Sequence, residues 1–153
     1  MKYFYKAAII LIFLTSCGYQ PILSNKVNNL SFEDLNASGN KKISLRILNN
    51  LNISKDIDVK TSLDVLSKYQ RVISSKNKKG NPEIFNIILD VKISVKSNGT
   101  LVDEKNFYES VNFNNEKNKF NLKKKENNLK SNLINKVSQD IRKYLLTLNY
   151  NDN

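Results

Sequence analysis

The sequence predicts an α+β fold: a two-layer sandwich in which a mostly antiparallel sheet of about four strands is packed by two helices, the longer one C-terminal. Three patterns carry this prediction. Apolar residues alternate with polar ones over residues 85–95, an Asn98-Gly99 turn follows, and apolar residues recur every four positions over residues 129–145. With 153 residues the chain has room for one such domain.

A short amphipathic helix is predicted within residues 40–52, where apolar residues are spaced by four. These residues are Ile43, Ile47 and Leu51. Ser38 or Asn40 would cap its N-terminus. The alternative for this segment is a strand, because Ile43, Leu45 and Ile47 also fall on alternate positions.

Several strands are expected around this helix. Residues 30–35 suit a short strand, and residues 57–65 alternate as a half-buried strand does. Residues 69–82 are expected to form a basic, polar connection, with room for one more short strand around Arg71 to Ile73. The strand at residues 85–95 then returns through residues 101–113 as the second arm of a hairpin.

The register of this hairpin has two solutions. A two-residue Asn98-Gly99 loop alone would set Val91 opposite Asn106, which places apolar and polar side chains on the same face. A three-residue loop or a bulge would instead set Val91 opposite Phe107. We prefer this second register, because a slip by one residue sends every side chain to the wrong face.

The last predicted element is a helix at residues 121–148, followed by a polar tail at residues 149–153. Its apolar stripe consists of Leu129, Leu133, Ile134, Val137, Ile141, Leu145 and Leu148. A stripe of this width is typical of a helix that packs on a core. The single α+β domain is therefore expected to cover residues 30–148.

The N-terminus has the pattern of an export signal. Lys2 and Lys6 precede an uninterrupted apolar run at residues 7–14, which is much shorter than the ~20 residues that span a bilayer. Leu14-Thr15-Ser16-Cys17 then resembles the lipobox of bacterial lipoproteins. That resemblance implies cleavage after residue 16 and a lipid-modified Cys17, because only the cysteine sulfur can form the required thioether.

The lipobox resemblance also predicts the location of the protein. Residues 1–16 would be removed as the signal peptide, and residues 17–29 would be a lipidated tether that anchors the domain to a membrane. Gly18 follows the cysteine, whereas an Asp at that position retains well-studied lipoproteins on the inner membrane. We therefore expect the protein to be located at the cell outer membrane, with its domain facing the periplasm.

Composition excludes several classes of function. The chain has no His and one Cys, which excludes His-based triads and His-ligated metals and leaves no free thiol once Cys17 is acylated. We expect no enzyme activity, no metal site and no cofactor. The formal charge of +11 falls to +9 without the signal and favours an anionic partner.

Nucleic acid is not the expected anionic partner. Of the 25 basic residues only Arg46, Arg71 and Arg142 are arginines, and no nucleic-acid-binding motif is present. AT-rich codon composition is another source of this basicity, since such codons encode Lys, Asn and Ile.

The opening of the mature chain, Cys17-Gly18-Tyr19-Gln20-Pro21, resembles that of LptE, the lipoprotein family that assembles lipopolysaccharide (LPS) in the outer membrane. The order of elements up to residue 148 is also similar to that family's. The resemblance implies a plug and chaperone inside the β-barrel of its partner LptD, which contacts LPS in transit. A different outer-membrane lipoprotein is the alternative, either an accessory of barrel insertion or a peptidoglycan-associated module.

Two lysine clusters are candidate LPS contacts. Lys78 and Lys79 lie in the loop before the strand at residues 85–95. Lys123 and Lys124 are expected in the first turn of the last helix, where the helix dipole repels cations and a bound polyanion would relieve that repulsion. Because the start and end of a hairpin share one end of the sheet, both clusters should converge at one pole. The alternative is a solvated lysine-rich surface without a ligand.

Overall fold

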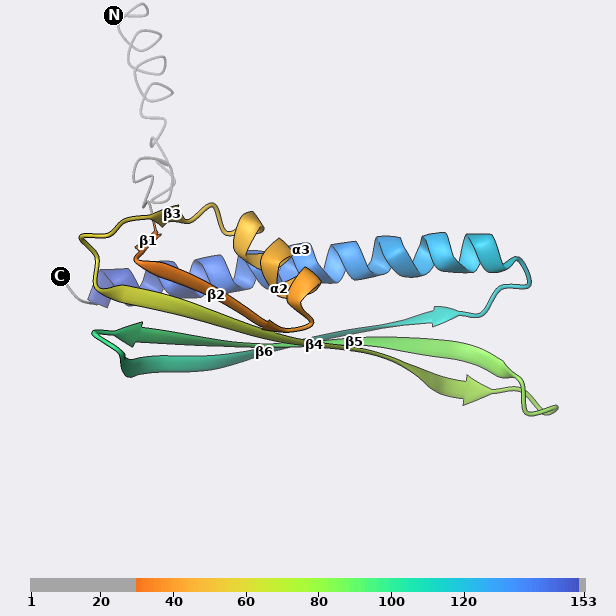
Figure 1. The fold of residues 1–153 in the computed structure, drawn as a ribbon. Coiled ribbons are helices and arrows are strands. Elements are labelled where there is room, and N and C mark those ends of the chain that lie inside the picture. Colours follow the sequence, from red (N-terminus) through yellow and green to blue (C-terminus); the bar gives the residue numbers. More distant parts are fainter. Residues whose placement is uncertain (1–29, 152–153) are drawn as a thin grey trace, which may run out of the picture.

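The computed structural model describes residues 30–151, which form a four-stranded sheet with two helices on one face (Figure 1). The elements in chain order are β1 (Ser31–Phe32), β2 (Asp34–Gly39), α2 (Lys41–Asn50), β3 (Ser54–Lys55), β4 (Thr61–Lys76), β5 (Pro82–Ser97), β6 (Thr100–Asn114) and α3 (Lys119–Asn151).

The sheet has the strand order β2-β4-β5-β6. The pairs β4–β5 and β5–β6 are antiparallel, whereas β2 is parallel to β4. The two short strands β1 and β3 pair with each other in parallel, outside the main sheet. The expected α+β sandwich, mostly antiparallel and with the longer helix at the C-terminus, is confirmed.

Helix α2 connects the parallel strands β2 and β4, and it confirms the helical prediction for residues 40–52. The Asn40 side chain accepts a hydrogen bond from the Ile43 amide, so Asn40 is the cap. Gly39, with a φ of +70°, turns the chain there, and a Cβ on it would lie 2.3 Å from the Ser67 carbonyl oxygen of β4. The buried hydroxyls of Ser44 and Ser67 are 2.7 Å apart, which ties α2 to the same strand.

Strand β4 differs from the prediction at both ends. It begins at Thr61, and Ile57 is 80% exposed in the turn before it, so residues 57–60 are not part of the strand. The connection expected at residues 69–82 is much shorter than predicted, because β4 continues to Lys76 and leaves a turn of only residues 77–81. The short strand expected around residues 71–73 is part of β4. The second half of β4 pairs with residues 82–89 of β5. These residues provide its backbone hydrogen-bond partners, which the local sequence of β4 does not reveal.

The preferred hairpin register is confirmed. Val91 pairs with Phe107, and Ile87 pairs with Val111. The loop is the two-residue Asn98-Gly99 turn, and an irregularity next to Val95 restores the register. A bulge of this kind adds one residue to one strand, so the apolar residues of both arms face the helices.

The core lies between α3 and the inner face of the sheet. All six alternating apolar residues of β5 over residues 85–95 are buried. The stripe of α3 faces them, with Val137 and Ile141 fully buried at its centre. The 33 residues of α3 and the 16 of β5 both extend about 50 Å, so the helix follows the whole length of the sheet.

Two boundaries differ from the expected ones. Residues 30–35 form two strands instead of one, since a bend at Glu33 separates β1 from β2. Helix α3 starts two residues earlier than expected and continues to Asn151, into the segment predicted to be a polar tail. No helix within residues 30–151 combines the length and apolar character needed to cross a membrane.

Candidate functional site

The predicted site residues lie in different parts of the chain. Cys17, the expected lipidation site, lies outside the described residues. Lys78 and Lys79 lie in the turn between β4 and β5, and Lys123 and Lys124 lie on α3. Figure 1 shows this turn and the start of α3 at the same end of the molecule, as the topology argument predicted. We call this end, made of residues 76–81 and 115–125, the basic pole.

The basic pole differs from the prediction at the helix terminus. The Asn118 side chain accepts hydrogen bonds from the amides of Phe120 and Asn121 at 2.9 and 3.2 Å, so Asn118 caps α3. Lys123 and Lys124 therefore lie in the second turn, not in the first. The effect of the helix dipole falls off within the first turn, and the expected repulsion from it does not explain these lysines.

Most lysines of the basic pole lack an acidic neighbour. Lys123 pairs with Glu126 at 3.4 Å, and Lys125 pairs with Glu116 at 3.1 Å. Within residues 30–151, the other lysines of the pole form no ion pair; they are Lys76, Lys78, Lys79, Lys117, Lys119 and Lys124. The pole therefore carries uncompensated positive charge, which attracts anions.

Beneath the lysines lies a buried carboxylate that sequence reasoning missed. Glu126 of α3 is only 4% exposed. It accepts a hydrogen bond from the Tyr69 hydroxyl at 3.0 Å and pairs with the Arg71 guanidinium at 3.2 Å, both from β4. Arg71 also stacks over the Phe85 ring, 3.9 Å from its centroid. These contacts join the first part of α3 to the outer part of the β4–β5 hairpin.

Burial and the neighbouring Glu126 carboxylate raise the pKa of Tyr69 to about 12. An unfolded tyrosine ionises near 10, so the protonated Tyr69 stabilises the fold below pH 10, and this contribution is lost as the pH rises towards 12. We therefore expect the free energy of unfolding to decrease between pH 9.5 and about 11.5, and to decrease less in Tyr69→Phe. Urea unfolding across this range measures the difference, with Tyr108→Phe, at a 63% exposed position, as the matched control. Equal pH dependence in all three proteins would contradict the assignment.

The three arginines all connect elements of the fold. Arg46 of α2 donates to the Ser131 hydroxyl of α3 at 3.1 Å, and Arg142 of α3 donates to the Leu51 carbonyl at the end of α2. Arg71 joins β4 to α3 as described. Because the guanidinium groups are used within the fold, the basic surface is provided by lysines.

The sheet face opposite the helices is covered by no described element (Figure 1). The side chains that β4, β5 and β6 place on this face are mainly polar. Ion pairs cross its strands, among them Lys92–Glu104 and Lys96–Asp64, each at 2.6 Å. The Asp64 carboxylate also accepts a hydrogen bond from Asn36 of β2, and its partners, Lys96 first, lower its pKa. This face offers a polar surface with few unpaired charges.

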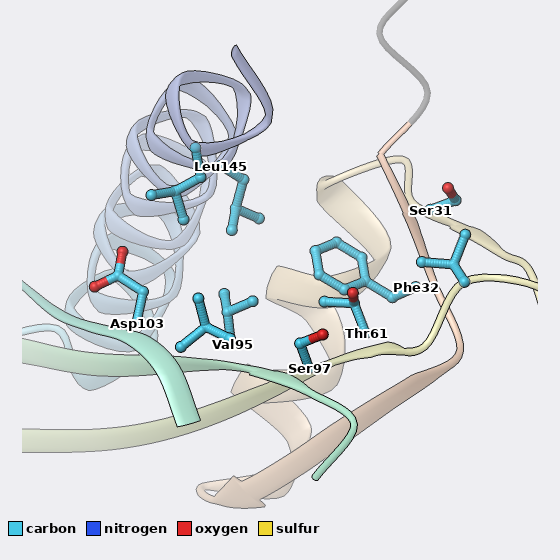
Figure 2. Close-up of a pocket in the computed structure, with 10 residues that line it drawn as sticks. Ser31, Phe32, Thr61, Val95, Ser97, Asp103 and Leu145 are labelled. Atoms are coloured by element: carbon cyan, nitrogen blue, oxygen red, sulfur yellow. The ribbon is translucent and has the colours of Figure 1, made fainter. Parts of the chain in front are cut away.

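A cavity of about 370 Å³ opens at the end of the molecule opposite the basic pole. In Figure 2, Phe32, Val95 and Leu145 point into it, with Thr61 and Asp103 at its margin. The Asp103 carboxylate accepts a hydrogen bond from Tyr144, which raises the pKa of that tyrosine to about 12. Asp103, the acidic residue that lines this cavity, therefore already has a hydrogen-bond partner within the fold. No group of three acidic, His or Cys side chains placed to hold a metal occurs within residues 30–151.

One local signal could have revealed the Glu126 cluster. Glu126 lies four positions after Leu122 and three before Leu129, so it falls on the apolar stripe of the helix. A carboxylate on a buried stripe requires a partner. The partner, Arg71, lies 55 residues earlier in the chain, and no local pattern identifies it.

Comparison with known proteins identifies a fold and no sequence family. No protein-family model matches the sequence, and no curated protein matches it. Among solved structures, rare lipoprotein B from Shewanella oneidensis is similar at a TM-score of 0.59 and 15% identity, over 77% of this chain and 97% of that one. An uncharacterised lipoprotein B from Nitrosomonas europaea has a TM-score of 0.57 at 13% identity, over 78% and 86% of the two chains. A minor lipoprotein from Acinetobacter baumannii has a TM-score of 0.55 at 14% identity, over 76% and 92%.

Proposed function

We propose that this chain is an outer-membrane lipoprotein of the LPS-assembly machinery, of the LptE type. It is anchored through Cys17 and faces the periplasm. It acts as a plug and chaperone of an LptD-type β-barrel, and it contacts LPS through the basic pole. This role is one of binding and scaffolding, without catalysis.

The observation that carries the proposal is the agreement between the N-terminus and the fold. The lipobox-like Leu14-Thr15-Ser16-Cys17 suggests a lipoprotein from sequence alone. The domain that follows has the fold of several bacterial lipoproteins. The resemblance to LptE rests on residues 17–21, whereas the fold rests on residues 30–151. These two observations therefore support an LptE-type lipoprotein independently.

The uncovered sheet face supports a partner with a polar surface. Its ion pairs and amides suit a wet interface better than they suit lipid or a hydrophobic core. The inner wall of a large outer-membrane barrel is polar because its residues alternate between lipid and lumen. A plug that presents this sheet face to the barrel wall would place one polar surface against another.

The basic pole supports an acidic ligand, and charge reversal tests it. Changing Lys78, Lys79, Lys123 and Lys124 to Glu should weaken LPS binding by about tenfold or more, because attraction to the phosphates becomes repulsion. Binding is measured at moderate salt, which screens distant charges while leaving close contacts.

The matched control reverses four exposed lysines away from the pole: Lys41, Lys42, Lys55 and Lys68. This variant has the same net charge and should lose much less affinity. If both variants bind LPS like the unmodified protein, or lose affinity equally, the lysines are a solvated surface and the pole is not the LPS site.

A further inference from the structure

Large apolar side chains are exposed at the end of the molecule opposite the basic pole. Ile57, in the turn before β4, is 80% exposed. Leu101 and Val102, at the start of β6, are 53% and 63% exposed. Together with the half-buried Val59 they form a surface that we call the apolar end. Apolar patches on a protein surface mark contacts with another protein or with a membrane.

Contacts within the fold bring the two segments of the apolar end together. The Asn98 amide of the β5–β6 turn donates a hydrogen bond to the Lys60 carbonyl at 2.8 Å. Val59 and Val102, which lie far apart in the sequence, both line the cavity of about 370 Å³. Ile57 lies in the turn immediately before Val59. The exposed side chains of both segments therefore lie around the mouth of one cavity.

The chain that precedes the domain enters it beside the same cavity. Ser31, labelled in Figure 2, lines the cavity, and the Leu30 carbonyl accepts a hydrogen bond from the Ser54 amide at 3.0 Å. Residues 17–29, between the proposed anchor and the domain, can span at most about 45 Å. Of the two ends of the domain, the apolar end is thus the one joined directly to the anchor.

The apolar end carries balanced charge, unlike the basic pole. The turn before β4 contains Lys55, Asp56, Asp58 and Lys60, and Lys60 pairs with Glu33 at 3.7 Å. A surface without net charge gains little from anionic headgroups, so its affinity for a membrane must come from the burial of apolar side chains. A zwitterionic phospholipid surface provides the environment that such side chains require.

We propose that the apolar end contacts the phospholipid surface of the membrane that holds the lipid anchor, with Ile57, Leu101 and Val102 inserted among the lipids. The contact is weak by itself, because only a few side chains take part. The tether makes it intramolecular, and the high effective concentration that results populates it. This inference rests on the Cys17 anchor of the proposed function and is independent of the LPS role.

Tryptophan substitutions test the contact, because the chain contains no tryptophan. The full-length gene carrying Ile57→Trp or Val102→Trp is expressed, and the lipidated protein is reconstituted in phosphatidylcholine vesicles. Phosphatidylcholine brominated on its acyl chains quenches an indole that lies among them, so it should decrease the emission of both variants by about twofold or more. Phe120→Trp, at a 75% exposed position of the basic pole, is the matched control and should keep its emission.

A second substitution tests whether these residues act as one surface. Ile57→Asp, combined with Val102→Trp, places a charge next to the lipids and disfavours insertion of the whole apolar end. Quenching should therefore fall to about half or less of its value in Val102→Trp alone. Tyr108→Asp, at a 63% exposed position in the middle of β6, is the control and should leave the quenching unchanged. Circular dichroism verifies that each variant is folded.

The possible failures are distinguishable. Mass spectrometry establishes whether the purified chain carries lipid, and a chain without lipid would overturn the anchor and this inference together. A lipidated chain in which neither tryptophan is quenched, or in which Phe120→Trp is quenched equally, would overturn the contact alone.

Two further outcomes would contradict the proposal by identifying another partner. Quenching that requires anionic phosphatidylglycerol would mean electrostatic docking instead of apolar contact. A blue-shifted emission that brominated lipid does not quench, and that increases with the number of chains per vesicle, would mean that a second copy covers the apolar end.

Discussion

Replacing Val137 by Asp should strongly destabilise the fold of this protein. Val137 is fully buried at the centre of the α3 stripe, in the same core as Ile87, Leu89 and Val91 of β5. An aspartate there would have no partner for its charge, and such substitutions cost about 4 kcal/mol or more. Domains of this size are typically stable by only about 5–15 kcal/mol, so thermal unfolding should show a large decrease in Tm or no transition at all.

The control for this substitution is Gln139→Asp, two residues along the same helix at an exposed position. It introduces the same side chain without burying it, and its effect should stay within about 0.5 kcal/mol. If Val137→Asp melted like this control, the stripe would not be the core of the domain, and the sandwich described above would be incorrect.

Replacing Cys17 by Ala should eliminate lipidation entirely and leave an uncut precursor. The alanine side chain has no nucleophile to form the thioether, and cleavage before residue 17 follows that modification in lipoproteins. Labelling with a fatty-acid analogue, followed by electrophoresis, measures both effects. The unmodified chain should incorporate the label and migrate as the shorter mature form.

Ser16→Ala provides the matched control, because alanine keeps a small residue before the cysteine. This variant should be labelled and processed like the unmodified chain. Label in the Cys17→Ala chain would show that the lipid is attached elsewhere, and the anchor assignment would then be wrong.

The long periodic elements could be predicted from sequence because their patterns are local. In β5 each alternate residue is apolar, and in α3 the stripe repeats every four positions, so burial on one face follows from the sequence. The hairpin register could be chosen because the wrong one would place polar side chains in the core.

The remaining features depend on partners distant in the chain. The second half of β4 carries Tyr69 and Arg71 on its inner face, and these residues read as a polar loop. Both side chains contact the buried Glu126 of α3, which lies 55 or more residues later in the chain. The parallel pairing of β2 with β4 likewise depends on a distant contact, because the backbone at Gly39, the last residue of β2, lies close to Ser67 of β4.

The candidate site was predictable in position but not in composition. The convergence of the two lysine clusters followed from hairpin topology alone, since both flank the same end of the sheet. The cap at Asn118 moved Lys123 and Lys124 into the second turn, which sequence reasoning did not anticipate. The 48% exposure of Ile73, near the end of β4, depends on where α3 stops covering the sheet, which is a property of the packed structure.

The proposed role in LPS assembly is tested most directly by identifying what the full chain binds in the cell envelope. The chain is extracted from the cell envelope in mild detergent and purified through a C-terminal tag, and the proteins and lipids bound to it are analysed by mass spectrometry. Cys17→Ala processed in parallel serves as the control. We expect a large outer-membrane β-barrel of the LptD type in stoichiometric amounts with the lipidated chain, accompanied by LPS. Recovery of the lipidated protein alone, or with barrel-insertion or peptidoglycan-associated proteins instead, would contradict a role in LPS assembly.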